Sequence, residues 1–274
     1  MRSVLITLAV LVALGTLGAA GFVWSGWYDI SANVQHTQPV YSLLEKVMRQ
    51  SVKLRAAAIA VPALGDAAQV ARGAACYVDK CVQCHGGPGV AQHEIGRSMQ
   101  PLPGPLVDAS ARWRPQELYW LTRNGIKMSG MPAWQFRLAD SEMWALVAFM
   151  QRLPTLTALE FRALAAAPPA QACGSEPVAA TPIDAERGRI ALTQYACNAC
   201  HVVPGVTGSN VHVGPPLAGI ANRSLLAGAV PNTPEQLVRW IRNPQSIDPL
   251  TTMPDMKVNE RDARDMAAYL TSLH

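Results

Sequence analysis

The sequence carries one five-residue pattern, Cys-x-x-Cys-His, at two places. The copies occupy residues 81–85 and 197–201. Two thiols at this spacing can form thioethers with the two vinyl groups of one porphyrin, and the adjoining histidine then lies beneath the iron as a ligand. We therefore predict two covalently bound haem c groups. The predicted attachment thiols and iron ligands are Cys81, Cys84, His85, Cys197, Cys200 and His201.

A pair of cysteines separated by two residues has other uses. It could form half of a zinc site, but zinc would need two further ligands for each pair. It could also be a redox-active dithiol, but that motif would need a βαβ context. The sequence offers neither, and the histidine directly after the second cysteine of both copies favours haem.

The N-terminal segment is apolar over about the thickness of a lipid bilayer. The apolar stretch covers residues 4–24, and aromatic side chains of the kind expected at a membrane interface follow it. These are Trp24, Trp27 and Tyr28. A cleavable signal peptide ending near residues 18–20 is the alternative, but the apolar run continues past that point. We predict an uncleaved membrane anchor over residues 1–30.

The charge before the anchor and the haem motifs both favour an exported protein. With Arg2 held inside, the rest of the chain lies outside the cytoplasm. We expect the bacterial cytoplasmic (inner) membrane, with the haem domains on the periplasmic side. There the two remaining cysteines, Cys76 and Cys173, could form a disulfide. Alternatively, Cys76 packs as a small apolar side chain, because it lies on a helical pattern five residues before Cys81.

Residues 31–66 form a predicted connector between the anchor and the first haem motif. Within residues 40–60 the apolar side chains lie mostly on one helical side, and four basic side chains lie elsewhere. The basic residues are Lys46, Arg49, Lys53 and Arg55. We predict an amphipathic helix that could lie on anionic lipid or dock a partner subunit, or that merely packs on the first haem domain.

An internal repeat extends well beyond the haem motifs. Short matching stretches precede and follow both motifs at nearly constant separation, and such self-similarity indicates two homologous domains. The matching pairs are 71–73 with 186–188, 115–118 with 234–237, and 148–150 with 268–270. We predict domain 1 over residues 67–162, an Ala- and Pro-rich linker over 163–182, and domain 2 over 183–274.

Each copy of the repeat has the pattern of three helices. A first helix leads into the haem motif, and a middle helix begins at Pro115 in one copy and at Pro234 in the other. A last helix covers residues 143–153 or 261–273. There is little strand signal, so the predicted fold class is all-α.

With these elements in this order, both halves resemble class I cytochromes c. The resemblance covers residues 67–153 and 184–273. In that family a glycine of the first helix lets the last helix cross closely and meet an aromatic residue, because the missing Cβ permits close approach. The matching pairs are Gly73 with Phe149 and Gly188 with Tyr269.

The resemblance also implies a methionine ligand for each iron. Residues 124–134 are similar to the distal loop of cytochromes that serve membrane dehydrogenases and oxidases, and their Met-Pro pair nominates Met131. In the second half, Met253 precedes Pro254 in a loop similar to that of small electron carriers. The following proline keeps the loop extended and free of helix. The alternative ligands are Met128, Met256, His93 and His212.

Further residues would support the iron ligands. Residues 214–217 resemble the family loop whose proline carbonyl accepts a hydrogen bond from the proximal histidine, which makes Pro215 the partner of His201. The first half departs from that pattern at residues 103–106, so the partner of His85 stays open. Arg223 and Arg239 could neutralise haem propionates or form exposed ion pairs.

The sequence therefore predicts a membrane-anchored electron carrier rather than an enzyme. A net charge of +4, with no basic cluster among aromatics and no phosphate-binding loop, gives no support for nucleic acid binding. The expected redox partners are a dehydrogenase or quinol-oxidising complex as donor and a terminal oxidase as acceptor. An integral subunit of an oxidase or dehydrogenase complex is the first alternative. A dihaem cytochrome c peroxidase and a structural or sensing haem module are the others.

Overall fold

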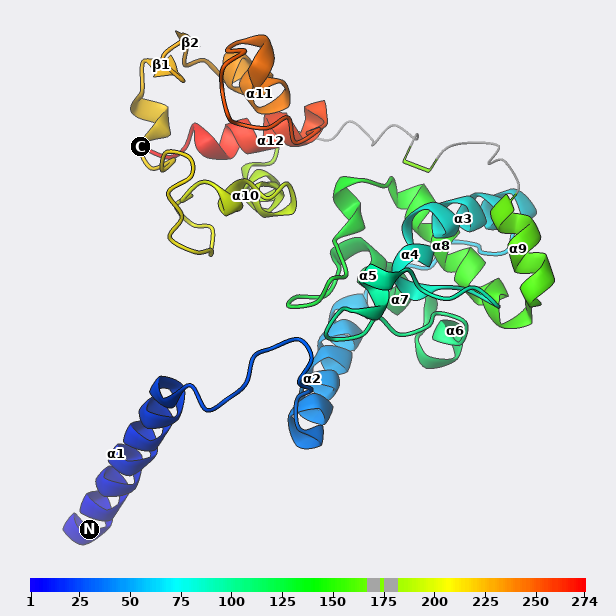
Figure 1. Cartoon of the computed structure of the whole chain (residues 1–274), viewed down its shortest axis with the longest axis horizontal. Helices are drawn as coiled ribbons and strands as arrows, with labels where there is room; N and C mark the ends of the chain where they lie inside the picture. The colour runs from blue at the N-terminus through cyan, green and yellow to red at the C-terminus, as the bar shows by residue number, and fades with distance from the viewer. Residues whose placement is uncertain (167–172, 175–181) are drawn as a thin grey trace.

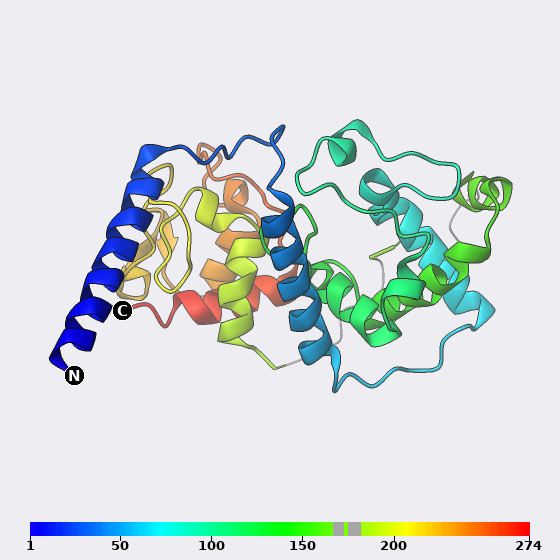
Figure 2. The ribbon, with the colours of Figure 1, turned by 90° about the horizontal axis from the view of Figure 1, so that it is seen from below.

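The structure of the chain consists of two helical lobes preceded by two further helices (Figures 1 and 2). It is a computed structural model that describes residues 1–166, 173–174 and 182–274. We call residues 67–166 lobe 1 and residues 182–274 lobe 2. Most of the predicted linker, residues 167–172 and 175–181, lies outside the described residues.

The two N-terminal helices are both exposed over much of their length. Helix α1 (Arg2–Ser25) has a mean hydropathy of 2.3 over its most apolar stretch and no buried residue. Among the described residues it is the one helix that is long and apolar enough to cross a membrane. Helix α2 (Gln38–Ala56) begins with proline in its first turn, as expected for a helix start. The predicted apolar N-terminal helix is therefore present.

The two halves of α2 have different surroundings. In its C-terminal half Val52 and Ala56 are buried, and the Arg49 guanidinium lies 4.8 Å from the ring centroid of Trp113 in lobe 1. In its N-terminal half the large apolar side chains are exposed: Tyr41, Leu43, Leu44 and Val47. The helix thus packs on lobe 1 with one half and leaves the other half without a partner among the described residues.

Lobe 1 is built on the crossing of two helices, α3 and α8. Its elements are α3 (Ala67–Lys80), α4 (Val82–His85), α5 (Glu94–Arg97), α6 (Ala109–Arg112), α7 (Pro115–Asn124), η1 (Trp134–Phe136), α8 (Asp140–Arg152), η2 (Leu153–Thr155) and α9 (Ala158–Ala166). The aromatic rings of Tyr77, Phe149 and Phe161 pack together in its core. Helix α9 covers the first four residues of the predicted linker.

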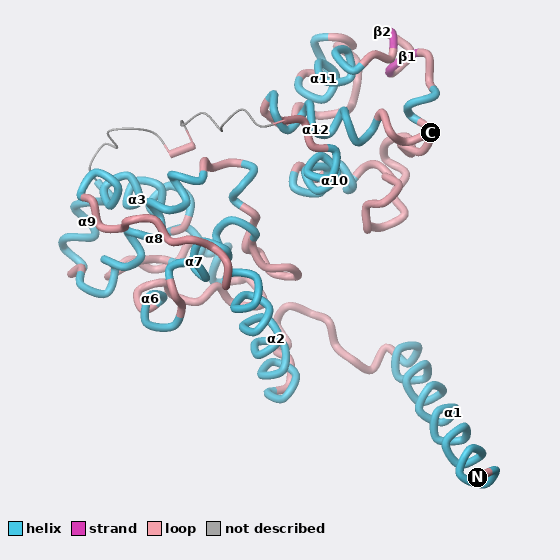
Figure 3. Tube along the Cα trace, turned by 180° about the vertical axis from the view of Figure 1, so that it is seen from behind, coloured by secondary structure: helices cyan, strands magenta, loops and turns pink. Residues whose placement is uncertain are grey.

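Lobe 2 repeats the same three-helix plan. Its elements are α10 (Ala185–Gln194), η3 (Cys197–Ala199), η4 (Ile220–Asn222), β1 (Leu225–Leu226), β2 (Val230–Pro231), α11 (Pro234–Arg242), η5 (Pro244–Ser246) and α12 (Glu260–Leu270). The two short antiparallel strands are the only strands of the described residues (Figure 3). The all-α prediction is confirmed, and both middle helices begin at the predicted prolines.

Glycine permits the helix crossing in both lobes. A Cβ on Gly73 would lie 1.9 Å from the carbonyl oxygen of Ala145 and 2.9 Å from the Cβ of Phe149. A Cβ on Gly188 would lie 1.9 Å from the carbonyl oxygen of Asp265. Since any side chain would collide with backbone atoms, only glycine allows these helices to approach so closely.

The two cysteines outside the haem motifs form a disulfide. Cys76 of α3 and Cys173 are bonded, with their Cα atoms 5.0 Å apart, and Cys76 is fully buried. The backbone N–H of Gly174 donates to the buried carboxylate of Glu142 at 2.7 Å, which fixes the same segment to the start of α8. Of the two alternatives for Cys76, the structure has the disulfide, and it ties residues 173–174 to the core of lobe 1.

Candidate haem sites

The first Cys-x-x-Cys-His motif forms one helical turn directly after α3. Cys81 ends α3 and precedes α4, and the backbone N–H of His85 donates to the Cys81 carbonyl at 2.8 Å. The buried hydroxyl of Tyr77 donates to the carbonyl of Gly86 at 2.9 Å, which fixes the end of the turn. The chain therefore brings both thiols and the histidine of this motif together on one short turn.

A backbone carbonyl holds the imidazole of His85 in one orientation. Its Nδ1 lies 2.7 Å from the carbonyl oxygen of Gly104, and a carbonyl can only accept, so the Nδ1 carries the proton and Nε2 is left with a lone pair. Burial lowers the pKa of His85, although the hydrogen bond to Gly104 opposes this shift. The neutral imidazole, which is the form that binds iron, is therefore favoured.

The second motif has the same hydrogen bonds on a slightly different turn. Residues Cys197–Ala199 form the 3₁₀ turn η3, and the N–H of His201 donates to the Cys197 carbonyl at 2.9 Å. The Nδ1 of His201 lies 2.7 Å from the carbonyl oxygen of Pro215. A Cβ on Gly214 would lie 2.4 Å from the imidazole, so the loop can pass beneath the ring only because this residue is glycine.

The four motif cysteines form no disulfide and no metal cluster in the described part of the chain. Burial raises the pKa of the Cys81 thiol to about 12 and that of the Cys197 thiol to about 11. Zinc binding and redox chemistry both need the thiolate, which these values disfavour at neutral pH. Among the described residues, no group of three His, Cys, Asp or Glu ligands includes any of the four. The donor set therefore fits haem attachment better than zinc.

Both nominated methionines lie in loops whose backbone is fixed in the same way. The N–H of Met131 donates to the hydroxyl of Ser129 at 3.2 Å, and the N–H of Met253 donates to the hydroxyl of Thr251 at 3.3 Å. Their carbonyls accept from the Ile126 N–H at 3.2 Å and from the Gln245 amide at 2.6 Å, respectively. The backbone of each methionine is therefore fixed at both of its polar groups.

This shared pattern has a sequence signal that extends beyond the Met-Pro pair. A Ser or Thr stands two residues before each methionine and a proline follows it, over residues 129–132 and 251–254. The loop of lobe 1 also needs Gly125, because this residue has a φ of 67° and a Cβ on it would lie 2.6 Å from the Met131 carbonyl.

The alternative ligands differ from one another in their exposure. Met128 is 92% exposed, and His93 and His212 are exposed as well. Met256 packs against the hydrophobic core of lobe 2. Arg223, one of the two candidates for a propionate contact, donates to the carbonyl of Pro216 at 2.6 Å and so supports the loop beneath His201.

Comparison with known proteins agrees with this architecture. Residues 68–150 match the family model "Cytochrome C oxidase, cbb3-type, subunit III", and residues 185–274 match the family model "Cytochrome c". Each lobe thus contains one cytochrome c-type domain, and the chain carries two of them in tandem, as in a dihaem class I cytochrome c. Cytochrome c domains bind haem c covalently, so this protein is a cytochrome c electron carrier.

One curated protein is similar to part of the chain. The chain is 37% identical over 90 residues to "Cytochrome c oxidase subunit 2" of Alkalihalophilus pseudofirmus. The match covers 32% of this chain and 25% of that protein, so the chain spans about a quarter of the relative's length. No solved structure matches the chain significantly.

Proposed function

We propose that the protein is a membrane-anchored dihaem electron carrier. In the first lobe Cys81 and Cys84 would hold the haem, with His85 and Met131 as the axial ligands of the iron. In the second lobe the corresponding residues would be Cys197, Cys200, His201 and Met253. Bound in this way, each haem iron takes up and releases one electron.

One observation carries the proposal: both histidines are held by a backbone carbonyl at the same distance. His85 and His201 each have Nδ1 at 2.7 Å from a carbonyl oxygen, of Gly104 and Pro215 respectively. This contact fixes the ring and its tautomer, directs the Nε2 lone pair away from the contact, and makes the imidazole a stronger donor to a metal. Two such arrangements, each beside a pair of unbridged cysteines, support two haems rather than one.

The chain's own residues would set the reduction potentials. Thioether ligation opposite histidine stabilises ferrous iron and raises the potential, which suits a carrier that feeds an oxidase. The Gly104 and Pro215 carbonyls act in the opposite direction, because a more basic imidazole favours ferric iron. The two lobes differ in these carbonyl acceptors and in their loops, so the two potentials should differ.

The surroundings of the carrier follow from α1 and from the comparisons. The exposed apolar α1 supports an anchor in the bacterial cytoplasmic membrane, with both lobes on the periplasmic side. A donor dehydrogenase or quinol-oxidising complex and a terminal oxidase as acceptor are the proposed partners. Similarity of part of the chain to an oxidase subunit supports a respiratory chain.

An integral subunit of an oxidase or dehydrogenase complex is the second candidate function. Its specific support is the match of lobe 1 to the subunit III family model of cbb3-type oxidases. Purification after mild solubilisation separates the two candidates. A free carrier elutes alone, whereas a subunit elutes with a complex that oxidises an external donor.

Methionine substitutions test the ligand assignment. In Met131→Ala the haem of lobe 1 should lose its thioether ligand, so its reduction potential should fall and its absorption spectrum should change, while the other haem stays as it was. Met128→Ala is the matched control, because Met128 is exposed in the same loop. Met253→Ala and Met256→Ala form the equivalent pair in lobe 2. Unchanged spectra and potentials in Met131→Ala and Met253→Ala would reject the assignment.

A mass measurement tests the number of haems. The intact chain should carry the added mass of two haem groups, and Cys197→Ala with Cys200→Ala should reduce this to one. A chain with a single haem in the unaltered protein would contradict the dihaem proposal. Rapid turnover of hydrogen peroxide by the reduced protein would instead support the peroxidase alternative.

A further inference from the structure

The loop that follows Met131 contributes side chains to both lobes. Trp134 and Leu138 belong to the hydrophobic core of lobe 1, whereas Ala133 and Phe136 belong to that of lobe 2. The 3₁₀ turn η1 makes this division possible, since positions 133 and 136 lie one turn apart and share a face. One short segment of lobe 1 is therefore part of the core of lobe 2.

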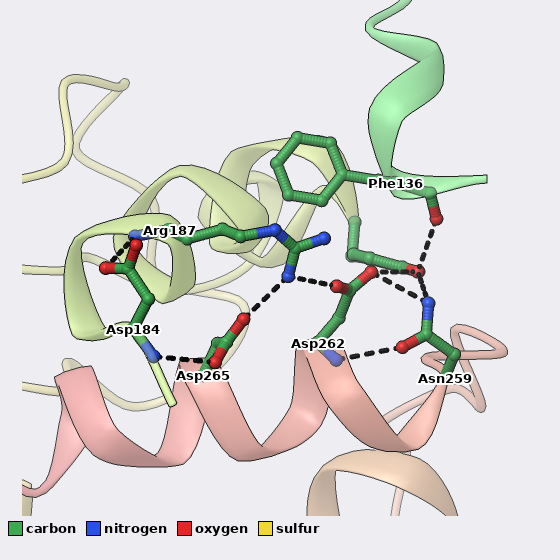
Figure 4. Close-up of polar contacts among 7 residues, drawn as sticks. Phe136, Asp184, Arg187, Asn259, Asp262 and Asp265 are labelled. Carbon is green, nitrogen blue, oxygen red and sulfur yellow. Dashed lines mark hydrogen bonds and ion pairs between the residues drawn. The ribbon is translucent and has the colours of Figure 1, made fainter. Parts of the chain in front are cut away.

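Phe136 is the side chain that enters lobe 2 most deeply. It is 2% exposed, and the guanidinium of Arg187 lies 4.8 Å from the centroid of its ring. The hydroxyl of Tyr195 donates to the Phe136 backbone carbonyl at 3.3 Å, so lobe 2 contacts both the ring and the backbone of this residue (Figure 4). A buried aromatic ring with a cation over its face is a typical anchor of an interface.

A buried polar network holds the receiving side of lobe 2 in place. Arg187 lies between two buried carboxylates, at 2.5 Å from Asp262 and 2.6 Å from Asp265. Tyr195 donates to Asp262 at 2.8 Å, and the Asn259 amide donates to the same carboxylate at 2.9 Å (Figure 4). These contacts all lie within lobe 2, so the surface that receives Phe136 is held together by residues of lobe 2 itself.

The rim of the contact adds a second link between the lobes. The Arg137 guanidinium donates to the carbonyl of Gln194 at 2.8 Å and lies 5.5 Å from the ring centroid of Tyr195. Arg137 itself is exposed, so it closes the edge of the contact without being buried. The arrangement of an apolar centre with a polar rim is that of a specific interface.

The contact lies close in sequence to both candidate haem sites. Phe136 follows Met131 by five residues in the same loop, and Tyr195 precedes Cys197 by two residues. A path through bonds therefore leads from the Met131 backbone to Phe136, across the hydrogen bond to Tyr195, and on to Cys197. Electrons tunnel faster through covalent and hydrogen-bonded contacts than across gaps, so this contact provides a bonded connection between the two candidate haem sites.

We propose that Phe136 is a positioning residue for electron transfer between the two haems: it docks the distal loop of lobe 1 in lobe 2 and holds the two sites at a fixed separation. This proposal rests on the dihaem function proposed above. The electron lost by one ferrous iron reduces the ferric iron of the other lobe, so the exchange needs no further reactant. Without this contact between Phe136 and lobe 2, electron transfer between the haems would depend on random collisions of the two lobes.

The test measures electron redistribution inside the full-length holoprotein in detergent micelles. After rapid reduction by less than one electron per molecule, the rate at which absorbance moves from one haem to the other is recorded. In Phe136→Ala the docking equilibrium should weaken by at least about 100-fold, because a large buried ring is removed. The internal rate should then fall in proportion to the docked fraction. Gln135→Ala, in the same turn, is the control with an unchanged rate.

Two further measurements separate positioning from other roles. Equilibrium spectra and potentials of both haems should be unchanged in Phe136→Ala, and hydrogen exchange should increase in peptides around residues 134–136 and 195. Arg137→Glu, at the exposed rim, should reduce the same rate even if Phe136→Ala does not fold. An unchanged internal rate in the folded Phe136→Ala protein or in Arg137→Glu would overturn the proposal.

The remaining outcomes distinguish a failure of the docking role from a failure of the proposed dihaem function. If the lobe 1 haem of Phe136→Ala lost its methionine spectrum, Phe136 would act within its own loop and the docking role would be rejected. If the unaltered protein contained one haem, the dihaem function itself would fail before the docking test began. A slower rate with intact spectra supports both the proposed function and the dock.

Discussion

Replacement of Gly188 by alanine should destabilise lobe 2 alone. A Cβ at this position would lie 1.9 Å from the carbonyl oxygen of Asp265, whereas ordinary contact begins at 3.4 Å. Helices α10 and α12 would therefore have to separate by about 1.5 Å, the difference between these distances. The obstacle is backbone on both sides, so no side chain can turn aside to make room.

The size of the effect follows from two opposing contributions. Overpacking of a core costs about 1–3 kcal/mol, and a rigid backbone obstacle favours the upper end of that range. Alanine in place of glycine within a helix recovers about 1 kcal/mol. We expect a net loss of about 2 kcal/mol in the free energy of unfolding, which lowers the Tm of a lobe of this size by about 8–16 °C.

Calorimetry of the full-length protein measures this shift, and hydrogen exchange assigns it to a lobe. Peptides from α10 and α12 should exchange faster in Gly188→Ala, while those from α3 and α8 serve as an internal control. Gly73→Ala should produce the reverse pattern, because its Cβ would meet Ala145 in lobe 1. Gly104→Ala is the steric control, since a Cβ there has no heavy atom within 4 Å. A Tm of Gly188→Ala within 2 °C of the unaltered protein, roughly 0.5 kcal/mol, would refute the reasoning.

Three other substitutions test the interactions that stabilise the lobes. Cys173→Ala opens the disulfide, whose partners are 97 residues apart in sequence. It should lower the free energy of unfolding of lobe 1 by about 2–4 kcal/mol, measured by urea unfolding. If the urea midpoint equalled that of the unaltered protein, the bridge would add no stability. Arg187→Met leaves two buried carboxylates without their cation and should lower the free energy of unfolding of lobe 2 by about 3–5 kcal/mol, which calorimetry would detect. A stability equal to that of the unaltered protein would mean that Arg187 does not stabilise the lobe through these carboxylates. Burial raises the pKa of Glu117, but hydrogen bonds from the Arg114 backbone and guanidinium outweigh it and hold the pKa below its ordinary value. The resulting stability is present above about pH 4.3 and is lost as the pH falls through the lowered pKa. Glu117→Gln should therefore make the free energy of unfolding of lobe 1 depend less on pH in this acid range. If the dependence of this free energy on pH were unchanged in the variant, Glu117 would not contribute to it.

The regular helices could be predicted from the sequence because their signals are local. Proline at the first position fixed the starts of α7 and α11, and α8 begins three residues before its predicted start because Glu142 accepts a hydrogen bond from the backbone at its N-cap. The single turns α5 and α6 were not predicted, since four-residue helices depend on the packing of distant segments rather than on their own sequence.

Some of the candidate site residues could likewise be predicted from local sequence, and others could not. The cysteines and histidines follow from one short motif, and the hydrogen bond of His201 to Pro215 follows the resemblance. The partner of His85 could not be predicted, because the loop that supplies Gly104 has no matching pattern. Nor could the position of Phe136, since an apolar residue in a loop gives no indication of which core will bury it.

The disulfide also constrains how the chain matures. Cys76 is bonded to Cys173, whereas Cys81, five residues later, would have to stay reduced for the proposed haem attachment. The two demands are compatible if α3 forms early, because five residues rise about 7.5 Å along a helix, which is farther than the Cα atoms of a disulfide usually lie apart. The early folding of this one helix would then direct Cys76 to Cys173 and leave Cys81 free for the haem.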